Sequence, residues 1–253
     1  MDENEQLQQK FWDEASARFS RLVSSSEDAH YGMFGMPPAE KDLRLLGEIK
    51  GSKILVLGSG SGKSAIGLAR QGAHVTAVDI SSVQIRKSKE LAQKHGIKVN
   101  FLTASFNDLN VFDDAQFNSV FSSYALQYTD QLDRVFGHVA RLLKPGGHFG
   151  FSMDHPDYMA LDHDTMTFDP DFKEGWHDII VPWFKNAPLT MYRRHSGTIE
   201  TSLREAGLEI SAKHEDQNEL IAFGAIRNGC VDMEHKQTTL IYGARKPALR
   251  PYQ

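Results

Sequence analysis

The amino-terminal part of the chain repeats its apolar positions with the period of an α-helix. Between residues 3 and 24 these positions recur at intervals near three and four, which predicts an amphipathic helix rather than a strand. The apolar side chains are Leu7, Phe11, Trp12, Ala15, Phe19 and Leu22. A serine-rich loop follows, and Pro38 then opens a second short helix that ends before a turn at residues 50–52.

From residue 53 onward, short apolar runs alternate with amphipathic stretches. Strands are expected at 53–58, 74–79, 98–103, 117–122 and 147–153, and helices at 63–71, 82–95 and 130–142. Runs such as ILVLG and VTAVD are apolar almost throughout, as in strands that helices cover on both faces. Strands that alternate with helices imply parallel crossovers. The pattern therefore predicts an α/β fold with a doubly wound, mostly parallel sheet.

The same pattern divides the chain into four parts. Residues 1–50 form amino-terminal helices and a lid, and residues 51–153 form a ligand-binding core. Residues 154–196 lack clean periodicity and are interpreted as a cap inserted over the substrate. Residues 197–253 return to the same sheet with a helix and two more strands.

Composition and charge narrow the class of protein. Of 253 residues, 40% are hydrophobic and 24% are charged, with a mean hydropathy of -0.41, which is typical of a soluble folded chain. A net charge of -5 argues against a nucleic-acid partner. One cysteine, Cys230, excludes a disulfide within the chain and a multi-cysteine zinc site. The polar first residues lack a signal peptide's apolar region, so we expect a cytoplasmic protein without a membrane anchor, either monomer or homodimer.

A glycine-rich loop follows the first predicted core strand. Gly58, Gly60 and Gly62 stand between that strand and a helix, where the backbone can turn sharply and approach a ligand. A phosphate-binding P-loop would need glycine at Leu57, and a dinucleotide fingerprint would need glycine at Lys63. The motif that remains is GxGxG.

An acidic residue at the end of the next strand makes the loop more informative. Asp79 stands where a carboxylate can accept hydrogen bonds from both hydroxyls of a ribose. A purely structural turn would also explain the glycines alone. The two features together indicate a nucleoside ligand.

Several segments together resemble a known family. They are LVLGSGSG at 55–62, VDIS at 78–81, SFNDLNVFDDAQFNSVFSSYALQY at 105–128, RLLKPGGHFGFSMDHP at 141–156 and LREAGLEI at 203–210. The chain resembles class I S-adenosylmethionine-dependent methyltransferases, in the small-molecule group related to quinone-pathway C-methyltransferases. The resemblance implies a Rossmann-like seven-stranded sheet whose last strand, at 238–246, is antiparallel and is inserted beside a strand at 207–213.

The resemblance also implies contacts with S-adenosylmethionine. Four loop residues would lie against its methionine and ribose parts: Gly58, Ser59, Gly60 and Gly62. The ribose hydroxyls would bind Asp79, and the adenine would pack on Ile80. Ser105 and the backbone amide of Phe106 would lie at the adenine edge. Ser122, at the tip of the fourth strand, would accept a hydrogen bond from the methionine ammonium.

Two positions depart from the family pattern. The family usually has an acid two residues before the first glycine, where this chain has Val56, and the acid at the adenine edge is Ser105 here. Each change removes a charge-assisted hydrogen bond that contributes about 1.5–3 kcal/mol when well formed. We therefore expect weaker cofactor binding than the pattern would give.

Methyl transfer from a sulfonium is an in-line displacement that chiefly needs an aligned acceptor and a dry site. An acceptor with a hydroxyl or an acidic carbon also needs a base, and histidine is the usual candidate. His155 follows the fifth strand, His195 precedes a helix, and Tyr124 follows the fourth strand, so these three are the catalytic candidates. Ordinary roles at a turn, a helix start or a packed interface would explain them as well.

Five further residues are candidates for contact with the acceptor: His30, Tyr31, Gln127, Trp176 and Trp183. The first two would close a lid, and the tryptophans would form an apolar wall. A solvated loop and ordinary packing are the alternatives. Eight acids between residues 154 and 178 indicate a cationic amine substrate, a magnesium site or a solvated loop; no tight ligand spacing supports a metal.

The sequence thus predicts a methyltransferase that acts on an oxygen, nitrogen or carbon atom of a small molecule. A cofactor-binding cyclase or sensor without methyl transfer is the second possibility. Nucleotide hydrolysis through the GKS at residues 62–64 is the third, and the missing first glycine argues against it.

Overall fold

One mixed sheet organises the computed structural model, which describes all residues except 23–27, 163–166, 169–170, 180–188, 217–237 and 249–253. Its seven strands are β1 (Lys53–Leu57), β2 (His74–Asp79), β3 (Asn100–Thr103), β4 (Phe117–Ser123), β5 (Leu143–Asp154), β10 (Glu209–Asp216) and β11 (Thr239–Arg245). They are ordered β10-β11-β5-β4-β1-β2-β3, and β11 runs antiparallel to both of its neighbours. The predicted fold, including the inserted antiparallel last strand, is confirmed.

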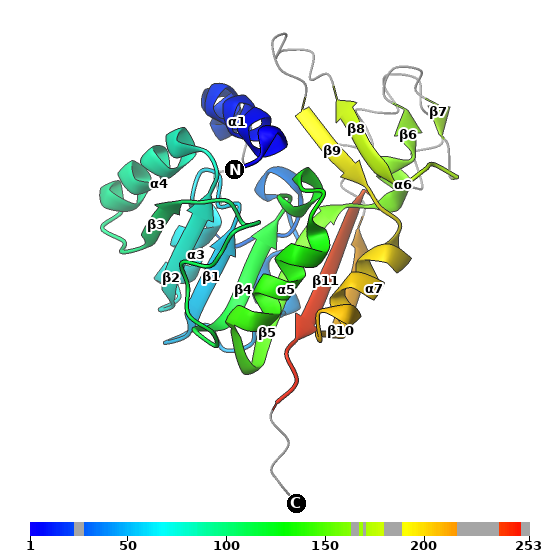
Figure 1. Ribbon diagram of the computed structural model, residues 1–253. Helices are drawn as coiled ribbons and strands as arrows, with labels where there is room; N and C mark the ends of the chain where they lie inside the picture. Colours follow the sequence, from blue (N-terminus) through cyan, green and yellow to red (C-terminus); the bar gives the residue numbers. More distant parts are fainter. Residues whose placement is uncertain (23–27, 163–166, 169–170, 180–188, 217–237, 249–253) are drawn as a thin grey trace, which may run out of the picture.

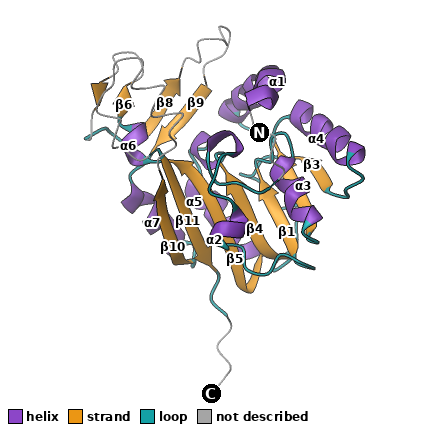
Figure 2. Cartoon of the chain, turned by 180° about the vertical axis from the view of Figure 1, so that it is seen from behind, coloured by secondary structure: helices purple, strands orange, loops and turns teal. Residues whose placement is uncertain are grey.

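Helices cover both faces of this sheet. The described helices of the chain are α1 (Glu3–Leu22), α2 (Glu40–Leu43), α3 (Lys63–Arg70), α4 (Ser82–Lys94), α5 (Leu132–Leu142), α6 (Pro156–Met159) and α7 (Ser196–Glu205), with 3-10 turns η1 (Met33–Gly35) and η2 (Leu126–Tyr128). Figure 1 shows the face covered by α5 and α7, and Figure 2 shows the face covered by α2 and α3.

Strand β1 shows why the sheet needs helices on both sides. Its side chains alternate, so that Leu55 and Leu57 pack into the core beneath α5 and α7, while Ile54 and Val56 pack into the core beneath α3 and α4. All four are almost completely buried. Each such side chain contributes about 1.5–3 kcal/mol on burial, which fixes the position of the strand beneath the glycine loop.

The second amino-terminal helix is shorter than the sequence predicts. Helix α2 ends at Leu43 because Arg44 adopts a left-handed conformation, with φ of 53°. The buried carboxylate of Glu40 then accepts the backbone N–H of Leu46 at 2.8 Å. This contact holds the chain in a non-helical path toward β1.

A cap lies over the carboxyl ends of the parallel strands. Its described parts are two antiparallel pairs, β6 (Leu161–Asp162) with β7 (Thr167–Phe168), and β8 (Gly175–Ile179) with β9 (Leu189–Arg193). Figure 1 shows α1 beside β9 above the sheet.

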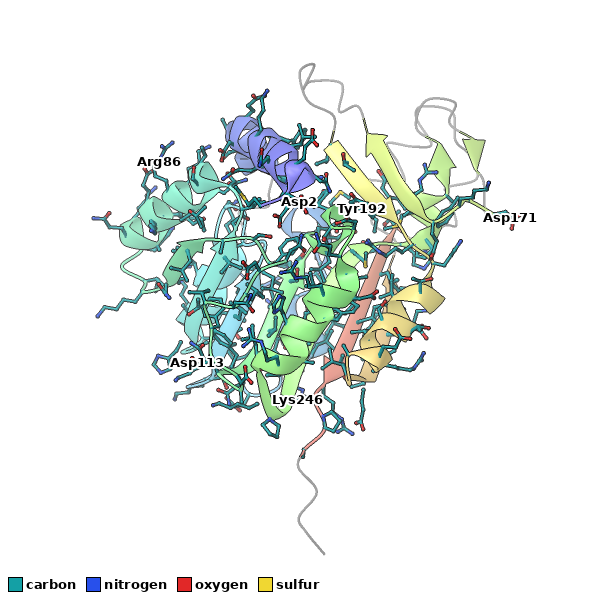
Figure 3. All side chains as sticks on the ribbon, viewed as in Figure 1. Asp2, Arg86, Asp113, Asp171, Tyr192 and Lys246 are labelled. Atoms are coloured by element: carbon teal, nitrogen blue, oxygen red, sulfur yellow. The ribbon has the colours of Figure 1, made fainter. Side chains whose placement is uncertain are left out.

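Helix α1 is attached to this cap by both apolar and polar contacts. Phe11 and Ala15 share a buried cluster with Leu189 and Met191 of β9. Asn4 donates a hydrogen bond to the hydroxyl of Tyr192 at 2.7 Å, and Figure 3 labels Tyr192 close to Asp2 at the start of α1. The amino terminus and the cap therefore form one cover.

Within the described residues, no helix has the length and apolar character to cross a bilayer.

Candidate active site

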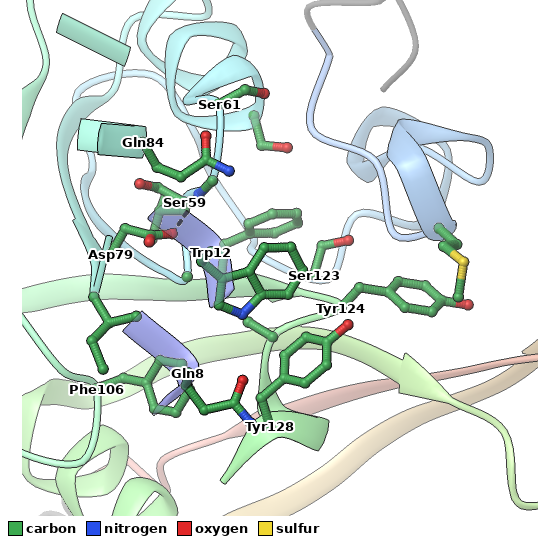
Figure 4. A pocket seen from close by; sticks show the side chains of 18 of the residues that line it. Gln8, Trp12, Ser59, Ser61, Asp79, Gln84, Phe106, Ser123, Tyr124 and Tyr128 are labelled. Carbon is green, nitrogen blue, oxygen red and sulfur yellow. Dashed lines mark hydrogen bonds between the residues drawn. The ribbon is translucent and has the colours of Figure 1, made fainter. Parts of the chain in front are cut away.

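A pocket of about 380 Å³ lies beneath this cover, at the carboxyl ends of the parallel strands. Its walls come from the loop after β1, the ends of β2, β4 and β5, helix α1 and strand β9. Open α/β sheets bind ligands at this edge because the loops after their strands diverge there. Figure 4 shows Ser59 and Asp79 on one side of Trp12, and Tyr124 and Tyr128 on the other.

The glycine loop is shaped by close packing as well as by its turn. Gly58 has φ of 65°, and a Cβ atom at this position would lie 2.3 Å from the Cβ of Ala125. Gly62 is the N-cap residue of α3 and does not line the pocket; a Cβ there would lie 2.7 Å from Ser88, so this glycine lets the loop pack on α4. Gly58, Ser59 and Gly60 do line it. The Ser59 hydroxyl is buried and has no hydrogen-bond partner in the described part of the chain.

Asp79 is held rigidly at the end of β2. One carboxylate oxygen accepts the N–H of Gly60 at 2.7 Å, and the other accepts the N–H of Ser81 at 2.9 Å. Burial raises the pKa of this carboxyl group to about 6, although both backbone hydrogen bonds act in the opposite direction. The strand end and the glycine loop are thus joined through one carboxylate.

A second carboxylate lies beside the next loop. Ile80, Ser105 and Phe106, which were predicted to lie at the adenine, all line the pocket. The Ser105 hydroxyl donates to Glu5 of α1, and the Asn107 side-chain amide donates to the same carboxylate oxygen at 3.1 Å. Glu5 is not among the residues predicted from the sequence, since nothing in the local pattern connects it with a residue 100 positions away.

Ser122 lies outside the pocket. Its side chain is completely buried and donates a hydrogen bond to the backbone carbonyl of Leu57 at 3.1 Å. The next residue, Ser123, lines the pocket instead. Because successive side chains of a strand face opposite sides, an error of one position moves a predicted contact from the ligand to the core.

Tyr124 does line the pocket, and it stands in the left-handed region with φ of 50°. Its hydroxyl lies 2.5 Å from the hydroxyl of Thr239 on β11. Burial raises the pKa of Tyr124 well above its ordinary value, so the phenol stays neutral at physiological pH. Gln127 is completely buried and does not line the pocket, whereas Tyr128 does.

The structure places both candidate histidines away from the pocket. His155 is 7% exposed, and its Nε2 lies 3.5 Å from a carboxylate oxygen of Glu215. His195 stands at the start of α7, and its ring stacks on Phe172 with 4.3 Å between centroids. The backbone N–H of His195 donates a hydrogen bond to the carboxylate of Glu174. These contacts correspond to the ordinary structural roles that the sequence left open.

The remaining predicted contacts are divided. His30 lines the pocket, but Tyr31 is completely buried and donates a hydrogen bond to Glu40 at 2.5 Å. Trp176 belongs to β8, but its side chain is not among those described, and Trp183 lies outside the described residues.

Asp154, the last residue of β5, is a pocket residue that the sequence analysis passed over. It is 1% exposed, and burial raises the pKa of its carboxyl group to about 7. A strand-end acid next to the favoured His155 was visible in the sequence. The histidine was preferred for its ordinary pKa, but alternation along the strand turns Asp154 toward the pocket.

Known proteins share both sequence and fold with this chain. Residues 54–147 match the family model of a methyltransferase domain. A ubiquinone biosynthesis O-methyltransferase of Alkalilimnicola ehrlichii is 33% identical over 107 residues, which are 42% of this chain and 43% of that protein. The aligned region spans between 32% and 43% of the length of the curated relatives compared first.

Solved structures extend the likeness beyond this core. An S-adenosylmethionine-dependent methyltransferase from Mesorhizobium loti is 25% identical with a TM-score of 0.67, covering 85% of this chain and 100% of that one. The cyclase SpnF has a TM-score of 0.66 at 18% identity, covering 97% of this chain and 96% of that one. The second likeness concerns the fold alone.

Proposed function

We propose that this chain, which shares a methyltransferase domain and fold with class I S-adenosylmethionine-dependent methyltransferases, transfers a methyl group from S-adenosylmethionine to a small molecule. The observation that carries the proposal is the joining of the glycine loop to Asp79 inside one pocket. Relatives that are ubiquinone biosynthesis O-methyltransferases support a small-molecule acceptor.

The loop and the end of β2 fit the sugar and methionine parts of this cofactor. Each oxygen of Asp79 accepts only one backbone N–H, so each keeps a lone pair for a ribose hydroxyl. At Gly60 a Cβ atom would meet nothing within 4 Å, so the loop backbone is open to a ligand there, and the unpartnered Ser59 hydroxyl is available to a polar group of the methionine part. We assign the nucleoside to this end of the pocket.

The adenine end would be completed by α1. Ile80 and Phe106 supply apolar surface for the ring, and Glu5 supplies a carboxylate next to Ser105. In the family pattern this acid belongs to the position of Ser105 itself. The proposal is that a helix from the amino terminus restores through space the acid that the local sequence lacks.

When bound, S-adenosylmethionine supplies a methyl carbon whose bond to sulfur breaks as the acceptor attacks, with the electron pair remaining on sulfur. The protein's own contribution is to hold the acceptor in line and to exclude water. Trp12 from α1 and Leu189 and Met191 from β9 form an apolar wall suited to that task.

Calorimetry with S-adenosylhomocysteine tests the cofactor site. We expect binding at micromolar concentrations, and no heat of binding by the folded protein would contradict the proposal. The matched control is Asp113→Asn, which removes one carboxylate from an exposed loop far from the pocket (Figure 3) and should leave binding unchanged.

A cofactor-binding cyclase or sensor is the second candidate. It is favoured by one observation, the apolar Val56 at a pocket position where the family pattern has an acid. Both candidates predict cofactor binding. Only the methyltransferase produces S-adenosylhomocysteine when candidate acceptors are added, and chromatography of the reaction mixture distinguishes the two.

A further inference from the structure

The carboxylate of Asp154 differs from the other carboxylates described in the pocket, which all accept hydrogen bonds. Its side chain is 1% exposed, yet neither of its oxygens has a hydrogen-bond partner within the described residues. Buried charged groups are normally paired, because removal from water is costly. An acid in this state is either protonated or prepared for a cationic ligand.

Tyrosines from three separate parts of the chain line the same pocket as this acid, and its charge acts on each of them. Tyr124 follows β4, Tyr128 belongs to η2 and Tyr158 belongs to α6, and all three line the pocket. Burial first, and the charge of Asp154 second, raise the pKa of each phenol, so all three remain neutral. Thr239 stands opposite Asp154 on β11. Among the described groups, no cation offsets the effect of burial on the acid.

The aromatic rings near this end of the pocket also favour a cationic ligand. Trp12 packs edge-to-face on Tyr128, with 5.2 Å between ring centroids, so the aromatic surface continues from η2 onto α1. Aromatic faces attract ammonium groups through their quadrupole. A lone carboxylate among aromatic rings is therefore the recognition chemistry of an amine.

The strand order separates Asp154 from the nucleoside end. Strand β5 is two positions from β1 and three from β2, with β4 between. Adjacent strands lie about 4.8 Å apart, which puts β5 roughly 10 Å from β1. Asp154 thus stands at the opposite end of the pocket from Asp79, where the methyl acceptor has room.

We propose that this end of the pocket binds an acceptor that carries an amine, and that Asp154 pairs with its ammonium form and removes the proton. The inference rests on the proposed function and specifies its substrate class. The N–H bond breaks, an O–H bond forms on Asp154, and the electron pair stays on nitrogen. That freed pair is the nucleophile for the displacement described above.

A charge argument favours an amine over a neutral hydroxyl. An ammonium and a carboxylate form a neutral pair, and proton transfer leaves a neutral amine and a neutral acid. Neither state contains an uncompensated charge in this aromatic cluster. With a phenol or an alcohol, one negative charge remains there both before and after proton transfer, which is unfavourable in a buried site.

Matched ligand pairs test the proposal by calorimetry, in the presence and absence of S-adenosylhomocysteine. The probes are 2-phenylethylamine, benzylamine and cyclohexylamine, each with the alcohol of the same carbon skeleton. We expect at least one amine to bind at least tenfold more tightly than its alcohol. In Asp154→Asn this preference should disappear, whereas the affinity for S-adenosylhomocysteine should stay within twofold.

Each other outcome contradicts a specific part of the argument. Equal binding of every amine and its alcohol overturns the inference. So does a tenfold loss of S-adenosylhomocysteine affinity in Asp154→Asn, because Asp154 would then hold the cofactor's own ammonium. Failure of the wild-type protein to bind S-adenosylhomocysteine counts against the proposed function instead. Thermal unfolding verifies that the variant folds, and Asp113→Asn, with the same loss of charge at an exposed site, should keep the amine preference.

Discussion

Two buried aspartates end two strands of the same sheet, and they are treated in opposite ways. Asp79 accepts a backbone N–H on each oxygen, at 2.7 and 2.9 Å. Asp154 accepts none from the described residues. Burial raises the pKa of both, to about 6 for Asp79 and about 7 for Asp154. Backbone N–H groups therefore bind the carboxylate of Asp79, whereas none binds that of Asp154 within the described residues.

This difference indicates how the two ends of the pocket are used. A carboxylate fixed by backbone donors has a set direction before any ligand arrives, which suits a cofactor that is the same in every catalytic cycle. A carboxylate without protein donors obtains its hydrogen bonds and its charge partner only from the ligand. We therefore propose that the cofactor binds at the end of β2 and that the methyl acceptor is selected at the end of β5. The following predictions test this proposal.

The largest expected effect concerns stability. The pKa of Asp154 lies near 7 in the folded protein against 3.8 for a free group, so the folded state binds the proton more tightly. Wild type should therefore lose stability relative to Asp154→Asn as pH rises from about 4 to 7, by about 4 kcal/mol in total. Urea unfolding of both proteins at pH 4, 6 and 8 measures the difference. A gap that does not change with pH would show that Asp154 is paired in the folded protein.

The second prediction addresses the opposite end. Asp79→Asn should weaken the binding of S-adenosylhomocysteine by about a hundredfold, because it loses charge-assisted bonds to the ribose and faces an N–H of Ser81 or Gly60 with its own amide hydrogens. Titration calorimetry at pH 8 gives the number. If Asp154→Asn caused the larger loss of this affinity, the roles of the two ends would be reversed.

Helix α1 gives a third and smaller effect. Glu5→Gln keeps the shape of the side chain and removes its charge, so we expect about a tenfold loss of S-adenosylhomocysteine affinity. The Ser105 and Asn107 contacts can still form to the amide oxygen, which should leave the melting temperature nearly unchanged. Glu3→Gln, at an exposed position two residues earlier on the same helix, is the matched control. Equal behaviour of the two variants would remove Glu5 from the site.

The features that could be predicted from the sequence are those set by neighbouring residues, and the features that were missed depend on contacts between residues far apart in the chain. Apolar runs and the strand-to-helix glycines are local, so the sheet and the loop with Asp79 were found correctly. Glu5 reaches its partners over 100 positions of sequence, and only the packing of α1 brings it there. His155, just after β5, and His195, at the start of α7, do not line the pocket, because their side chains are held by tertiary contacts with Glu215 and Phe172 that no local pattern reveals.

The smallest prediction separates two neighbouring serines. Ser122→Ala removes a buried hydrogen bond to Leu57, so it should lower the free energy of unfolding by about 1 kcal/mol and change S-adenosylhomocysteine affinity by less than twofold. Ser123→Ala alters a side chain that lines the pocket and accepts a hydrogen bond from the buried Ser152 at 3.2 Å, so it should also cost about 1 kcal/mol of stability but, unlike Ser122→Ala, lower the affinity about threefold. Calorimetry and urea unfolding of both variants are needed together. Since the two residues differ by one position on β4, the opposite result would mean that the face of β4 assigned to the ligand is the wrong one.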